Sequence, residues 1–213
     1  ASSGIIRASN GYNVDGGGVV LNGGKLADFQ GTLVANNISS TQDAGAIFTG
    51  DAITMSNTGS IIATNVYAGG GPSVIASEQI IVKDFAKIVV NGSWGGDAGA
   101  IGGTLLTMKG DAKVRCENAV AAGAGGCIGS SIVMSERASI MARNVSSQTL
   151  GGALAGGYPK QYLVVGGNAT IDIDRSSCGI YGGGLFFWEN MTFGNGAFHV
   201  QIKNTAAPCG SAM

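Results

Sequence analysis

The sequence predicts an all-β fold: a right-handed parallel β-helix, which is a solenoid of about seven coils with three short strands in each coil. The first observation is a repeat of 26 to 31 residues, marked by one anchor residue in every copy. A fixed period of this size is typical of solenoid proteins. The anchors are Asn10, Asn37, Asn65, Asn91, Asn118, Asn144, Arg175 and Asn204.

The second observation is a glycine with small or apolar neighbours, eight positions after most anchors. In five copies these glycines are Gly18, Gly45, Gly99, Gly126 and Gly152. Two further copies, which start at Asn65 and Arg175, are degenerate and reach Ser73 and Gly183, and the eighth anchor, Asn204, reaches Ala212. The unbroken repeat predicts one β-helix domain over residues 1–213, in which like positions of successive coils stack.

One coil, residues 99–118, shows the three expected strands in order. Residues 100–101 open a first short strand, after which two glycines turn the chain. Residues 105–108 form the second strand. Residues 113–117 alternate polar and apolar side chains, which is typical of a strand with one buried face, and Asn118 closes this third strand.

The third observation is that apolar side chains fall into columns when the repeats are aligned on their anchors. Residues two and four positions before most anchors are apolar. Ten positions before five of the anchors stand Met55, Ile81, Met108, Met134 and Val165. Neighbouring strands are expected to run parallel about 4.8 Å apart, and crossovers between parallel strands are right-handed as a rule.

The anchor asparagines have a structural role in this prediction. Asparagine tolerates the left-handed backbone conformation that a sharp corner requires, and stacked amides can hydrogen-bond along the axis. The expected ladder consists of Asn37, Asn65, Asn91, Asn118 and Asn144.

The amino-acid composition agrees with this fold and argues against two classes of partner, nucleic acids and membranes. Glycine accounts for 38 of 213 residues and proline for only 3, which favours short strands joined by tight turns over a collagen-like chain. Charged residues make up 12% and the net charge is −1, without a basic patch, so no nucleic-acid partner is expected. No apolar run reaches the roughly 18 residues of a membrane helix, so no membrane insertion of this segment is expected.

The repeats resemble those of chlamydial polymorphic outer-membrane proteins and related adhesin-like β-helices, which carry many copies of GGAI and FxxN. Similar to the first motif are residues 151–154 (GGAL), 125–128 (GGCI), 43–47 (DAGAI) and 97–101 (DAGAI). Similar to the second, with an aliphatic residue in place of Phe, are residues 62–65 (IATN), 88–91 (IVVN) and 141–144 (MARN). This resemblance implies an extracellular adhesin.

Two carboxylates are the main candidates for catalysis. Asp172 and Asp174 are two residues apart in a predicted strand and so point to the same side. Glycosidases use paired carboxylates, and a lyase needs an acidic metal-binding cluster with a basic residue. Neighbouring coils add only Arg143 and Lys203. We therefore interpret the pair as an exposed polar face and keep a polysaccharide lyase or hydrolase as the lesser alternative.

The cysteines and the single histidine do not match a metal site. Cys116, Cys127, Cys178 and Cys209 contain no CxxC pair, and His199 has no second histidine to join it. We therefore expect no metal, no catalytic residue and no cofactor. The four cysteines allow two disulfides, for example Cys116–Cys127 and Cys178–Cys209, or are small buried apolar residues.

Five asparagines lie in glycosylation sequons and are candidate sites if the chain passes through a eukaryotic secretory pathway. Asn168 and Asn190 are the better candidates. The other three, Asn37, Asn91 and Asn144, belong to the anchor column, where packing in a corner would block modification.

The last coil, residues 176–213, is rich in aromatic side chains. Phe186, Phe187, Trp188 and Phe193 form either a bulkier core or a contact surface for a partner. The chain opens in the third strand of a coil and closes just past an anchor, so its two ends are expected to be complementary halves of one repeat.

These observations predict a non-enzymatic structural or adhesive protein that is extracellular or on a cell surface. Its expected partner is itself, by end-to-end stacking, or a cell-surface or glycan ligand. The alternative function is a filament subunit that polymerises head to tail through the open coil ends.

Overall fold

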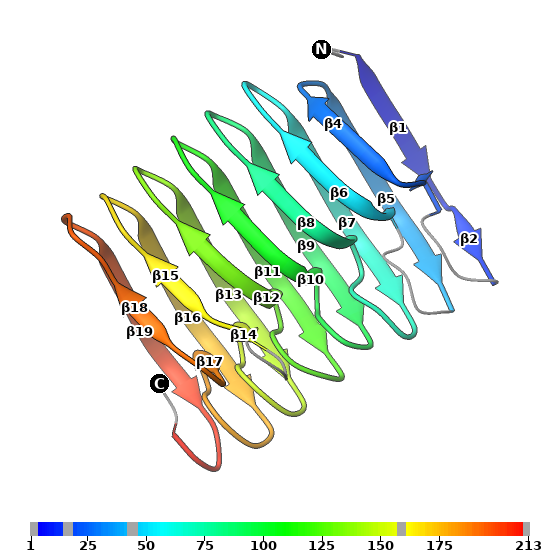
Figure 1. Cartoon of the computed structure of the whole chain (residues 1–213). Helices are drawn as coiled ribbons and strands as arrows, with labels where there is room; N and C mark the ends of the chain where they lie inside the picture. The colour runs from blue at the N-terminus through cyan, green and yellow to red at the C-terminus, as the bar shows by residue number, and fades with distance from the viewer. Residues whose placement is uncertain (1–3, 15–18, 42–46, 157–160, 211–213) are drawn as a thin grey trace.

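The computed structural model describes residues 4–14, 19–41, 47–156 and 161–210. Within these residues every regular element is a strand, and the chain winds as a right-handed parallel β-helix of about seven coils, which confirms the predicted fold class. The described chain starts at one end of the stack and finishes at the other (Figure 1). The repeat positions Gly18, Gly45 and Ala212 lie outside the described residues.

The strands form two parallel sheets that face each other across the core. We call the first the anchor sheet, because it carries the anchor residues. It contains β1 (Ile5–Ser9), β2 (Tyr12–Asn13), β5 (Thr32–Ser40), β7 (Ser60–Ala68), β9 (Lys87–Gly95), β11 (Lys113–Ala121), β13 (Ser139–Ser147), β16 (Thr170–Cys178) and β19 (His199–Ala206). The opposite sheet contains β3 (Leu21–Asn22), β4 (Lys25–Phe29), β6 (Phe48–Met55), β8 (Ile75–Val82), β10 (Ile101–Met108), β12 (Ile128–Met134), β14 (Leu154–Gly156), β15 (Leu163–Val165), β17 (Leu185–Phe187) and β18 (Met191–Phe193).

The division of a coil into three strands is visible at the two ends of the stack, where β3 and β4 precede β5 in the first full coil and the last two coils are divided in the same way. In those last coils β14 and β15, or β17 and β18, precede one strand of the anchor sheet. In the middle coils the first two predicted strands are continuous: β10 runs through Gly102 and Gly103, and its register with β12 shifts after Gly102. The two glycines thus make an irregularity within a strand and not a turn between strands.

The anchor is a bend inside a strand, so the expectation that Asn118 ends its strand is wrong. Before the bend Val114 and Cys116 face the core, and after it Ala119 and Ala121 do. Asn118 has a left-handed backbone with φ 54°. One extra residue in this conformation reverses the alternation of side chains, so both arms of the bent strand keep an apolar face inward.

The core consists of apolar columns that run along the axis between the two sheets. Leu106, Ile132 and Leu163 form one column in register and are fully buried. The predicted column ten residues before the anchors needs one correction. Val82, and not Ile81, pairs with Met108 and is buried. The reason is that the bend of that coil lies at Gly92, one residue after the predicted anchor Asn91.

The two sheets do not contain the same number of strands along their paths. The anchor sheet has eight strands along its path, from β1 to β19, whereas the path of the opposite sheet has seven, from β3 to β17. A second copy with β1 paired on β19 would therefore leave one place empty in the opposite sheet at the junction. Whether the two ends act as complementary halves of one repeat stays a prediction.

Candidate functional site

The asparagine ladder runs along the bend of the anchor sheet. Asn37 Nδ2 donates to Asn10 Oδ1 at 3.2 Å, and Asn65 Nδ2 donates to Asn37 Oδ1 at 3.3 Å. Further along, Asn144 Nδ2 donates to Asn118 Oδ1 at 2.6 Å. All five of these residues have positive φ, so one column supplies both the bend and the amide hydrogen bonds.

Asn91 does not occupy the bend of its own coil. The register places Asn91 opposite Thr64 and puts Gly92, with φ 73°, opposite Asn65. Glycine adopts the left-handed conformation more easily than asparagine, so the sequence Asn91-Gly92 moves the bend one residue later. Counting from Gly92 also brings Val82 into the column predicted for Ile81.

The residue before the bend supplies an acceptor where the bend itself lacks an asparagine. Asn118 Nδ2 donates to Asn91 Oδ1 at 2.8 Å, next to the bend at Gly92. Asn204 Nδ2 donates to Asp174 Oδ1 at 2.7 Å, next to the bend at Arg175. The ladder bonds thus form two runs, Asn10–Asn37–Asn65 and Asn91–Asn118–Asn144, and the Asn204–Asp174 bond stands apart from both.

Substitution of Asn118 can separate two effects of this residue on stability: its left-handed backbone conformation and the hydrogen bonds of its side-chain amide. Both Asn118→Gly and Asn118→Ala remove the bonds to Asn91 and Asn144. Alanine must in addition adopt a left-handed backbone conformation, which costs about 1–2 kcal/mol. Part of this difference is offset, because the glycine variant gains more conformational entropy on unfolding than the alanine variant. We expect Asn118→Ala to unfold about 1 kcal/mol more easily than Asn118→Gly in urea titrations. Equal stability of the two variants would show that the bend does not limit the choice of residue.

The candidate catalytic carboxylates are held in ion pairs on the outer face of β16. Asp172 Oδ2 lies 3.6 Å from an Nη atom of Arg143, and Asp174 Oδ2 lies 3.7 Å from Nε of Arg175. Lys203 stands beside Asp174 in the register. The structure therefore brings together the four residues weighed for catalysis: Asp172, Asp174, Arg143 and Lys203.

The electrostatics around Asp174 favour a fixed negative charge over proton transfer. The hydrogen bond from Asn204 lowers the pKa of Asp174 below its ordinary value, and the positive charges of Lys203, Arg175 and Arg143 lower it further. A glycosidase needs one carboxyl whose pKa is raised, so that it can donate a proton near neutral pH. Asp174 has the opposite environment.

Acid should destabilise the fold through three such carboxyl groups. Besides Asp174, the pKa of Asp111 is lowered by its hydrogen bonds from Arg137, and the pKa of Asp28 by those from Ser56 and Gln30. Because the folded pKa is depressed, the stabilisation is complete above the unfolded pKa, near 3.8, and is lost as the pH falls through the lower folded values. We expect the melting temperature to fall from pH 5 to pH 2, and to fall less in Asp111→Asn. An identical pH profile for Asp111→Asn and the parent chain would contradict this assignment.

One of the two suggested disulfides is formed. Cys116 in β11 and Cys127, just before β12, are joined with their Cα atoms 5.7 Å apart, and both are fully buried. The pair Cys178–Cys209 is not formed, which corrects that suggestion. Cys209 stands in register with Tyr181, and the Cys178 thiol instead donates to backbone carbonyls of Thr149 and Tyr181.

All five sequon asparagines are exposed residues. The side chains of Asn37, Asn91 and Asn144 are hydrogen-bonded in the ladder, and Asn168 Oδ1 accepts from the backbone N–H of Ala197 at 3.4 Å. Asn190 precedes β18 at the surface, and glycosylation of any of them stays a prediction.

The aromatic side chains of the last coil divide between core and surface. Phe187 is 9% exposed and packs in the core, so it is not part of a contact surface. Trp188 and Phe193 are 53% and 39% exposed. Phe186 stacks on Tyr181 with ring centres 5.9 Å apart and meets Trp188 edge to face. His199 is exposed on β19.

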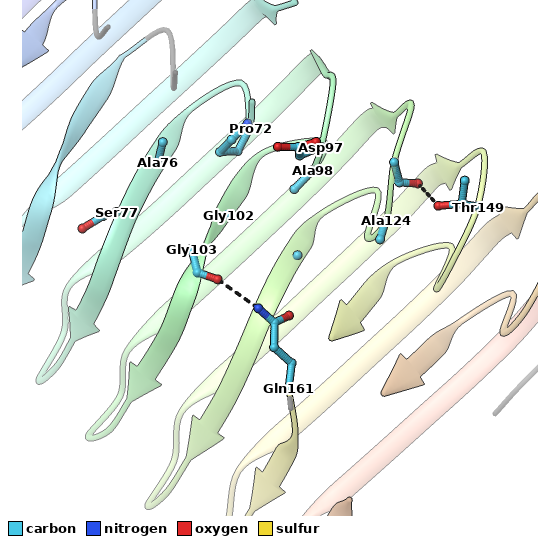
Figure 2. A pocket seen from close by; sticks show the side chains of 12 residues that line it. Pro72, Ala76, Ser77, Asp97, Ala98, Gly102, Gly103, Ala124, Thr149 and Gln161 are labelled. Carbon is cyan, nitrogen blue, oxygen red and sulfur yellow. Dashed lines mark hydrogen bonds between the residues drawn. The ribbon is translucent and has the colours of Figure 1, made fainter. Parts of the chain in front are cut away.

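A groove on the outer face of the opposite sheet was not anticipated from the sequence. Figure 2 shows this axial groove, which has a volume of about 580 Å³ and crosses four successive coils. Its floor is the outward column of Ala76, Gly102 and Gly129, which are neighbours in the register. The lining residues are Pro72, Ala76, Ser77, Asp97, Ala98, Gly102, Gly103, Gly123, Ala124, Gly129, Thr149 and Gln161.

The floor carries only small residues, and its two glycines leave no room for a Cβ atom. A Cβ atom on Gly102 would lie 2.9 Å from Cγ of Pro72, and one on Gly129 would lie 2.9 Å from Cβ of Ala98. Polar groups stand at the rims, where Gln161 Nε2 donates to the Gly103 carbonyl at 3.3 Å and Thr149 Oγ1 to the Gly123 carbonyl at 2.8 Å. Among the described lining residues Asp97 alone is charged. The signal in the sequence was a small residue at the same outward position of three successive coils.

Comparison with known proteins adds no relative to this description. The chain has no significant match to a protein-family model, a curated protein or a solved structure. In the described part of the chain no group of three or more His, Cys, Asp or Glu residues could hold a metal ion. The described residues also contain no helix long and apolar enough to cross a bilayer. The resemblance to chlamydial repeats stays a prediction.

Proposed function

We propose that the chain is a non-enzymatic structural and adhesive element of an extracellular surface, and that it holds an extended, uncharged glycan in the axial groove. The groove supports this function because it follows the solenoid axis over four coils, or about 14 Å between the outer two at the usual strand spacing. Hydroxyl, amide and backbone groups at its rims suit the hydroxyls of a neutral polymer. The buried Cys116–Cys127 disulfide agrees with an oxidising compartment.

Filling the groove tests this proposal. Ala76 is half-buried on the floor, so Ala76→Leu places a side chain in the groove without a change of backbone. The control is Thr107→Leu, which also faces outward from the opposite sheet but lies outside the lining. Affinity electrophoresis against soluble mannan, galactan and β-glucan is expected to show retardation of the parent and of Thr107→Leu, and little or none for Ala76→Leu.

Two results would contradict the adhesive function. One is that none of the three polysaccharides retards the parent chain. The other is release of reducing sugar from any of them that disappears in Asp172→Asn or Asp174→Asn, because this would establish the enzymatic alternative.

The filament alternative remains a proposal with one observation in its favour and one against it. Exposed apolar side chains stand at both ends of the described chain, with Ile5 62% and Tyr12 64% exposed at one end and Phe193 at the other. Against it, in-register stacking of β1 on β19 leaves an empty place in the opposite sheet. Negative-stain microscopy at high concentration would decide, since a head-to-tail filament predicts fibres whose length grows with concentration.

A further inference from the structure

A second depression follows the bend of the anchor sheet, away from the axial groove. We call it the anchor groove, and its volume is about 470 Å³. It extends over the four coils that contain β11, β13, β16 and β19. Its lining residues are Asn118, Val120, Asn144, Val145, Ser146, Arg175, Ser176, Ser177, Asn204 and Ala206.

The ladder amides that line this groove keep part of their hydrogen-bonding capacity. Each asparagine amide has two N–H donors and two acceptor lone pairs, of which a ladder bond to one neighbour uses one donor or one lone pair. Asn144 uses one donor on Asn118, and the next coil presents Arg175, which has no acceptor, in place of an asparagine. Ser146 and Ser177, neighbours in the register, add hydroxyl groups along the same groove.

Arg175 gives the groove a cation. Its side chain is 65% exposed, and its Nε lies 3.7 Å from the Asp174 carboxylate, beyond hydrogen-bond distance. That carboxylate already accepts a hydrogen bond from Asn204 at 2.7 Å. The guanidinium therefore keeps its terminal nitrogens for a planar oxyanion, the partner that an arginine fork matches best.

The charges around Arg175 leave a local excess of positive charge. Arg143 and Lys203 lie on the strands that flank β16, and the carboxylates near them are Asp172, Asp174 and Glu117, which stands beside Arg143 in the register of β11 and β13. Glu117 is itself paired with Arg115 at 2.6 Å, so four cations face three carboxylates, in a chain whose net charge is −1. An anionic ligand is favoured at this place over a neutral one.

We propose that the anchor groove binds a uronic-acid saccharide, with a carboxylate on the Arg175 guanidinium and sugar hydroxyls on Asn144, Ser146 and Ser177. This site is separate from the axial groove and does not depend on the function proposed for it. The ligand differs from the one proposed there by its acidic group, because the axial groove offers no cation in its described lining.

The test compares two variants of Arg175 in calorimetric titrations with an oligogalacturonate. Arg175→Asn removes the cation and places at the bend the residue type found there in most coils, so this variant is expected to melt at or above the temperature of the parent. Arg175→Lys keeps the charge but loses the two-pronged geometry. We expect affinity for the oligogalacturonate to fall at least about tenfold in Arg175→Asn, as for the loss of one charge-assisted hydrogen bond, and to fall less in Arg175→Lys.

Three comparisons decide the outcome. A neutral galactose oligomer of the same length should bind the parent at least about tenfold more weakly than the oligogalacturonate. Ser177→Leu, which fills the groove beside Arg175, should weaken oligogalacturonate binding, whereas Ala76→Leu in the other groove should not. Equal affinity for the acidic and neutral oligomers, undiminished binding by Arg175→Asn, or acetate binding as tight as that of the oligomer would each overturn the proposal.

Discussion

Replacing Gly99 with alanine is expected to lower the free energy of unfolding by about 3 kcal/mol or more, the upper end of what overpacking costs. A Cβ atom at this position would lie 1.8 Å from the carbonyl oxygen of Gly126 in the next coil. The obstacle is backbone and not the tip of a mobile side chain. The Gly99 N–H also donates to the Gly125 carbonyl at 3.0 Å, so the two coils cannot move apart without loss of this bond.

Gly166→Ala is the matched control for this substitution. Its new Cβ atom would lie 3.9 Å from the Met134 carbonyl oxygen, which is ordinary contact, and Gly166 does not have a positive φ. Alanine there should be neutral or should stabilise by about 0.4–1 kcal/mol, through the lower entropy of the unfolded chain. Urea unfolding measures both variants, and a Gly99→Ala chain as stable as Gly166→Ala would contradict the close approach of the coils.

Leu106→Ala is expected to lower the free energy of unfolding by about 2–5 kcal/mol, the range for truncation of a buried leucine. Leu106 is fully buried in the middle of the stack, between Ile80 and Ile132 of the neighbouring coils. The coils above and below keep their own hydrogen bonds to β10, so the cavity cannot close by collapse of the strand.

Leu105→Ala provides the comparison on the same strand. Leu105 is half-buried and faces outward, so its truncation leaves no cavity and should cost about 1 kcal/mol or less. Both variants are measured by urea unfolding at equal protein concentration. Equal losses at positions 105 and 106 would mean that the two faces of β10 are assigned the wrong way round.

The fold was predictable because it is encoded locally and then repeated. The alternation in residues 113–117 identifies the buried face of one strand, and the same pattern recurs at a nearly constant interval. Stacking of identical coils needs no information about contacts between distant parts of the chain, so the interval alone predicts which residues become neighbours. The columns of Met108, Met134 and Val165 follow from this rule.

The prediction was wrong where two adjacent residues compete for one role. Asn91 and Gly92 both suit a left-handed bend, and the sequence pattern favours Asn91 because asparagine recurs there. The structure selects Gly92, because the intrinsic backbone preference of glycine is stronger. The acceptor roles of Asn91 and Asp174 follow only after the bends are placed.

The sequence by itself determined the period, the buried columns and the direction of the stack, because each depends on side-chain type at fixed spacing. Only the tertiary structure decided that Cys116 pairs with Cys127 while Cys178 and Cys209 stay apart, and that small outward residues of three coils form the floor of a groove. It also revealed a depression beside Arg175 in the anchor column. The physical reason is that these features depend on distances across the axis and between coils. These distances change when a coil is longer by a few residues, whereas the pattern of residue types in the repeat stays the same.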